Sequence, residues 1–136
     1  MILVTANEDR GERREVYVPH GERSMVHHSY LSPDGRWVLM VLMDESGSLL
    51  PCQIVPFDGS ASIRVIGPSP ATCTSAAWSP DGDWVYFSAN PGGRFHIWRQ
   101  KFPAGPLQQV TSGPTAEEGI AMSPDGQSLL TLVAAE

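Results

Sequence analysis

One tetrapeptide recurs through this chain at nearly regular intervals. Ser-Pro-Asp-Gly begins at Ser32, at Ser79 and at Ser123, so the copies start 47 and 44 residues apart. A short apolar or small stretch precedes each copy, and a strand-like run follows it, such as 36–41 after the first. The repeated tetrapeptide therefore joins two neighbouring strands of a repeating unit.

The chemistry of a tight turn explains why these four residues recur. Proline fixes φ at the first central position, aspartate bonds to nearby backbone, and glycine takes the site with positive φ. Asp34, Asp81 and Asp125 occupy the same place in three separate units, and each has this local task. We therefore interpret them as turn residues rather than as metal ligands or acid–base groups.

Repeats of about 40–50 residues with four short strands each are typical of β-propellers, in which each repeat forms one blade. We predict ten strands from the first repeat onward, near 27–31, 36–43, 51–56, 61–66, 75–78, 83–88, 95–101, 107–111, 119–122 and 127–134. Residues 2–5 resemble a second strand, and 15–18 a third strand, of an earlier blade. The second strands are apolar on both faces, as expected between adjacent blades.

The predicted fold class is all-β: a partial β-propeller of about three four-stranded blades in a single segment, 1–136. We divide it into the end of a blade (1–26), two blades (27–66 and 67–111) and the start of a blade (112–136). Propellers close with about four to eight blades. We therefore expect completion by missing chain or by dimerisation, the simplest closed form being a six-bladed ring of two copies.

At these repeats the sequence resembles the TolB-like, WD40-like propeller repeats. Residues 78–84 (Trp-Ser-Pro-Asp-Gly-Asp-Trp) match best, and 95–99 and 109–111 look like that family's third and closing strands. Leu31 and Met122 depart from the pattern, because each stands where the family has the leading tryptophan.

The resemblance implies a non-catalytic scaffold for protein–protein interaction or for sensing a ligand at the propeller face. Related blades occur in periplasmic TolB, in bacterial Ser/Thr kinases and in prolyl-oligopeptidase-like hydrolases. The strands look most similar to the stand-alone or kinase-linked bacterial type. The alternative is therefore an accessory propeller domain of a larger bacterial enzyme whose catalytic part is absent here.

Composition and charge exclude several other classes. The formal net charge is -6 and the sequence pI is about 5.1, which disfavours binding to nucleic acid or anionic lipid. The longest apolar run, 37–43, is much shorter than the roughly 20 residues of a membrane span. The first residues lack the basic region of a signal peptide, so we predict neither a signal peptide nor membrane insertion, and the compartment stays open.

Residues that could carry chemistry do not form a recognisable site. The histidines are dispersed along the chain: His20, His27, His28 and His96. Neighbours on a strand point to opposite faces, so the adjacent pair is not expected to chelate one ion. Residues 67–71 lack the last glycine of a nucleophile elbow, and 91–94 lack the Lys-Ser/Thr of a phosphate loop. We predict no catalytic, cofactor-binding or metal-binding residue, and no enzyme activity.

Three features leave alternatives open. The four tryptophans (Trp37, Trp78, Trp84 and Trp98) fit packing between blades, or a platform on which a ligand stacks. Cys52 and Cys73 fit two small unpaired residues, or one disulfide. The charged segment 8–23 fits a solvated hairpin loop, or a loop that docks a partner.

Overall fold

The structure is a computed structural model that describes residues 3–6, 11, 13–17, 24–60, 62–68 and 70–134. His20 and much of the charged segment 8–23 lie outside the described residues. Among the described residues every regular element is a strand, in agreement with the predicted all-β class. No helix there is long and apolar enough to cross a membrane.

The strands follow the repeat closely, including all ten predicted from the first repeat onward. They are β1 (Leu3–Ala6), β2 (Arg13–Tyr17), β3 (Met25–Leu31), β4 (Trp37–Met43), β5 (Gln53–Pro56), β6 (Arg64–Val65), β7 (Cys73–Trp78), β8 (Trp84–Ala89), β9 (His96–Lys101), β10 (Leu107–Gln109), β11 (Ala116–Met122) and β12 (Leu129–Ala134).

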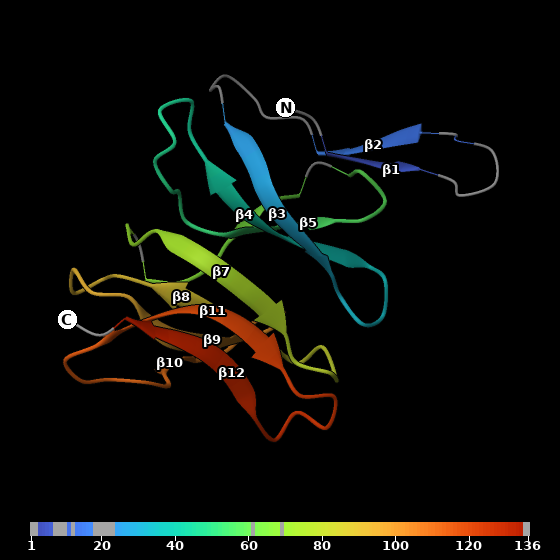
Figure 1. The fold of residues 1–136 in the computed structure, drawn as a ribbon. Helices are drawn as coiled ribbons and strands as arrows, with labels where there is room; N and C mark the ends of the chain where they lie inside the picture. Colours follow the sequence, from blue (N-terminus) through green and yellow to red (C-terminus); the bar gives the residue numbers. More distant parts are fainter. Residues whose placement is uncertain are drawn as a thin grey trace.

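The strands form two complete sheets and two strand pairs, all antiparallel (Figure 1). We call the sheet β3-β4-β5-β6 the first blade and the sheet β7-β8-β9-β10 the second blade. The N-terminal pair is β1–β2, and the C-terminal pair is β11–β12. Within each sheet the strands lie side by side in chain order, which is the meander expected of a propeller blade.

The Ser-Pro-Asp-Gly turns have the geometry expected from their chemistry. The hydroxyl of Ser32 donates to Asp34 Oδ1 at 2.6 Å and accepts from the backbone N–H of Trp37 at 3.0 Å. Gly35 has a φ of 74°, in the region that favours glycine. The same serine–aspartate bond recurs at 2.6 Å in the other two copies. These bonds support the interpretation of the three aspartates as turn residues.

The main core lies between the first and second blades. Leu39 and Val41 of β4 are fully buried, and they belong to the same cluster as Ala76 of β7 and Phe87 of β8. The expectation that second strands are sandwiched between blades is therefore confirmed for β4 and β8. Trp78, at the end of β7, donates its indole N–H to the carbonyl of Tyr30 across this junction at 2.9 Å.

The two cysteines join the blades covalently. Cys52 stands just before β5 and Cys73 begins β7, and they form a disulfide with a Cα–Cα distance of 5.7 Å. Both are buried, and the backbone N–H of Cys73 donates to the carbonyl of Leu50 at 3.2 Å. The simpler expectation of two unpaired residues is therefore wrong, because blade stacking brings the starts of these two strands together.

Candidate functional site

The segments that connect the strands differ in how far their sequences vary. One end of the blades, the turn end, carries the Ser-Pro-Asp-Gly turns, which repeat the same hydrogen bonds at each copy. The connections 57–60 and 102–106 begin beside these turns, and their sequences differ from each other. The opposite end, the loop end, comprises the segments 44–48, 90–94 and 110–115, whose sequences differ from one another. Since repetition indicates a structural task, the variable loop end is the better candidate for a functional site.

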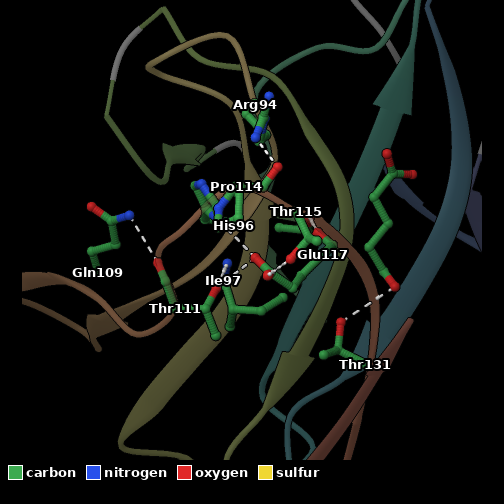
Figure 2. Close-up of polar contacts among 11 residues, drawn as sticks. Arg94, His96, Ile97, Gln109, Thr111, Pro114, Thr115, Glu117 and Thr131 are labelled. Carbon is green, nitrogen blue, oxygen red and sulfur yellow. Dashed lines mark hydrogen bonds and ion pairs between the residues drawn. The ribbon is translucent and has the colours of Figure 1, made fainter. Parts of the chain in front are cut away.

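A polar cluster lies beneath the loop end, where the second blade meets the C-terminal pair (Figure 2). His96, the first residue of β9, places Nδ1 at 2.6 Å from Oε2 of Glu117 on β11. The Thr111 hydroxyl donates to the same carboxylate oxygen at 2.9 Å, and the Thr115 hydroxyl donates to Oε1 at 3.2 Å. The side chains of His96 and Glu117 are only 14% and 8% exposed, so the pair is largely shielded from water.

Backbone bonds hold this cluster in place from both sides. Thr111 also accepts from the N–H of Ile97 at 2.8 Å, and the hydroxyl of Ser88 donates to the carbonyl of Glu117 at 2.6 Å. Above it, the Arg94 guanidinium donates to the carbonyl of Pro114 (Figure 2). The loops 90–94 and 110–115 are thereby tied to each other and to β11.

These contacts determine the ionisation of Glu117. Burial acts to raise the pKa of its carboxyl, but hydrogen bonds from His96, Thr111 and Thr115 act against burial, and the net result is a lowered pKa. A carboxylate with donors on both oxygens is stabilised in its charged form. The cluster is therefore built around an ionised glutamate.

This arrangement suits a structural joint better than catalysis. Both oxygens of Glu117 are already engaged, and the hydrogen bonds among the described residues bring no nucleophile to His96. The described residues also contain no group of three or more His, Cys, Asp or Glu side chains that could hold a metal ion. Sequence reasoning placed His96 on a strand face but missed Glu117, since 21 residues separate the two and no local pattern links them.

The adjacent His27 and His28 do not lie on opposite faces of the strand, although the sequence predicts that they do. Their ring centroids lie 4.3 Å apart, so the premise that strand alternation separates them is wrong. The register of β3 against β4 shifts between Val26 and His28, and such a bulge breaks the alternation of side chains. Both histidines are exposed, but the described residues supply no third metal ligand beside them.

The tryptophans are engaged by protein contacts. Trp78 is 8% exposed within the core between the blades. Trp37 packs edge-on against Phe102 at 5.3 Å between ring centroids. Arg99 lies 4.1 Å from the ring centroid of Trp84. These contacts favour blade packing over a ligand platform.

Comparison with known proteins supports the fold. No family model matches the chain. The structure of TolB from Acinetobacter baumannii aligns with a TM-score of 0.74 at 19% identity, covering 96% of this chain and 31% of that one. The structure of a putative TolB from Agrobacterium tumefaciens aligns with a TM-score of 0.69 at 19% identity, covering 90% of this chain and 42% of that one.

The fold is thus that of a TolB-like β-propeller, as the sequence resemblance implied, and it is a partial one. The chain spans less than half the length of either matched structure.

Proposed function

We propose that this chain is a non-catalytic propeller scaffold whose loop end binds a protein partner or a small ligand. The observation that carries the proposal is the contrast between the repeated turns and the segments opposite them. The Ser-Pro-Asp-Gly turns repeat one set of hydrogen bonds, whereas the loop-end segments 44–48, 90–94 and 110–115 differ from one another. Variable loops on a rigid frame are a common way to build a binding surface.

The loops are ordered in ways that favour binding. In the loop 44–48, Asp44 Oδ1 accepts from the backbone N–H groups of Ser46 and Ser48, each at 2.9 Å. The loops 90–94 and 110–115 are tied together above the buried cluster of His96 and Glu117. A surface that is already ordered loses less conformational entropy on binding.

We further propose the division of the chain into blade segments given above, and a dimer as the closed form. The competing proposal is an accessory propeller of a larger bacterial kinase or hydrolase. It draws support from the longer TolB structures, of which this chain covers only 31% and 42%.

A peptide selection tests the scaffold proposal. Phage-displayed random peptides should yield binders whose affinity falls at least tenfold in Gly92→Trp. Gly92 is exposed in the loop 90–94, and a Cβ added there would have no atom within 4 Å, so the variant should fold normally. The matched control is Arg36→Trp at the turn end, which should bind as the wild type does.

Two results would contradict the proposal. One is turnover of ester or peptide substrates by the purified chain, because it would show catalysis. The other is a set of binders lost in Arg36→Trp but retained in Gly92→Trp, because binding would then lie at the turn end.

A further inference from the structure

The contact between the N-terminal pair and the first blade is similar to another contact in the structure. That second contact joins β6, the fourth strand of the first blade, to the second blade. Arg14 of β2 donates to the carbonyl of Phe57 at 2.6 Å, and its guanidinium lies 5.1 Å from the Phe57 ring centroid. Arg64 of β6 donates to the carbonyl of Pro103 at 2.7 Å and lies 5.5 Å from the ring centroid of Phe102. Each arginine thus caps the phenylalanine that follows the third strand of the next blade.

The apolar residues two positions further on match as well. Val16 and Ile66 are each 6% exposed. Val16 packs in a cluster with Met40 of the second strand β4, and Ile66 packs in a cluster with Phe87 of the second strand β8. This equivalence makes β2 a fourth strand and β1 a third strand. The sequence-based assignment of these segments as second and third strands is therefore shifted by one.

The C-terminal pair supplies the complementary strands. A Ser-Pro-Asp-Gly turn joins β11 to β12, as it joins the first and second strands of both complete blades. Among the described residues, β12 pairs only with β11, so its other edge is unpaired. The strands 3–6 and 13–17 are thus of the type that would follow β12 in a complete blade.

Apolar side chains of β12 are exposed, whereas the side chains at the equivalent positions of β4 are buried. Counted from the turn serine, Leu130 and Leu132 correspond to Leu39 and Val41 of β4. Leu130 and Leu132 are 76% and 75% exposed, whereas Leu39 and Val41 are each at 0% because the second blade covers them. Large apolar side chains exposed together on one strand indicate a surface that is normally covered.

A groove beside β12 lies where a third strand lies in the complete blades. It has a volume of about 330 Å³ and lies between β10 and β12, with Val110 and Leu129 in its lining. The equivalent space between β6 and β8 is only about 60 Å³, because it is bordered by Gln100 to Pro103 in and after the third strand β9.

The first blade exposes the other half of such a junction. Leu31 ends β3 immediately before the turn, at the position that Trp78 has in β7. Trp78 is 8% exposed, since it packs against the preceding blade, whereas Leu31 is 54% exposed. The exposed leucines of β12 and the exposed Leu31 of β3 therefore correspond to the two sides of one blade–blade contact.

We propose that β11–β12 of one copy and β1–β2 of a second copy form one composite blade, in the order β11-β12-β1-β2. Two composite blades and four complete ones would then close a six-bladed ring by twofold symmetry, within the range of known propellers. This inference rests on the scaffold proposal, for which it supplies the closed frame. The occupant of the groove is thus a defined segment of a second copy.

The register of the new pairing follows from the complete blade. Leu39 pairs with Ile54, and Ile54 pairs with Arg64. Thr5 pairs with Arg14, the equivalent of Arg64. Leu130, the equivalent of Leu39, is therefore placed opposite Thr5 of the second copy.

Light scattering on the purified chain tests association. The wild type should have about twice the chain mass of 14.8 kDa. Leu132→Asp should reduce the mass to that of one chain while retaining the β-sheet circular dichroism spectrum. The matched control is Ile63→Asp, because Ile63 is 45% exposed but lies outside the proposed contact. A folded wild-type monomer would overturn the proposal, and so would a dimer that Leu132→Asp leaves intact.

Disulfide trapping tests the register. The double variant Thr5→Cys with Leu130→Cys should give a reducible dimer on a denaturing gel, whereas either single variant should not. Thr5→Cys with Val133→Cys is the out-of-register control and should cross-link far less. Equal cross-linking of the two double variants would overturn the proposed register. Peptide binding that persists in a monomer would leave the scaffold proposal standing while the composite blade fails.

Discussion

At the scale of single residues, the carboxylate of Glu117 is a buried acceptor that draws together side chains from three segments of the chain. It accepts from His96, Thr111 and Thr115 while its own carbonyl accepts from Ser88. These bonds link the second blade to the C-terminal pair, and they lie beneath the loops that we propose as the binding surface.

Glu117→Gln should destabilise the protein because an amide cannot accept hydrogen bonds on both of its terminal atoms. Hydrogen bonds to charged groups contribute about 1.5–3 kcal/mol each, so we expect a loss of about 1–3 kcal/mol after partial rearrangement. Urea denaturation measures this loss. The control is Glu118→Gln, since Glu118 is the exposed neighbour on the same strand. Equal effects of the two substitutions would contradict the assigned role.

The lowered pKa of Glu117 predicts a definite pH dependence. A carboxyl whose pKa is lower in the folded state than in the unfolded state stabilises the fold above its unfolded pKa of about 4.3. That contribution disappears as the pH falls through the lowered pKa. The gap in unfolding free energy between wild type and Glu117→Gln should therefore be smaller in acid than at neutral pH. A gap that widens in acid would contradict this account.

At the scale of elements, the disulfide between Cys52 and Cys73 ties the start of the third strand in one blade to the start of the next blade. Cross-linking two residues separated by 21 positions restricts the unfolded chain by about 3 kcal/mol. A reducing agent should therefore lower the unfolding free energy of the wild type by about that amount. The double variant Cys52→Ala with Cys73→Ala should not respond to the reductant. A wild type that is equally insensitive would contradict the prediction.

Elements next to a repeat motif could be predicted from the sequence, whereas those without one were harder to assign. The strands on either side of each turn were correctly placed, because proline, aspartate and glycine define the turn by local chemistry. The N-terminal pair has no such turn, and its proposed place rests on contacts with the first blade that are made by Arg14 and Val16. The pairing of Cys52 with Cys73 and of His96 with Glu117 arises from stacking of blades, which leaves no local pattern.

At the scale of the whole molecule, the described residues hold two four-stranded sheets and two strand pairs. We propose that the N-terminal pair is the third and fourth strands of one blade and the C-terminal pair the first and second strands of another. On this assignment the twelve strands amount to three four-stranded blades, one of which is split between its second and third strands. The exposed leucines of β12 and the exposed Leu31 of β3 are then two sides of one contact. In the ring that we propose, closure takes place at the edge of β12, so this edge is the critical feature.

Amide hydrogen exchange along β12 tests this central claim most directly. The Ser128 carbonyl accepts from Ser123 on the β11 side, so alternation along the strand directs the N–H groups of Leu129 and Thr131 toward the open edge. If a second copy pairs there, these two amides should exchange as slowly as those of Val38 and Met40 at the same positions of β4. Rapid exchange at Leu129 and Thr131, with a protected amide at Leu130, would show an unpaired edge and contradict the account.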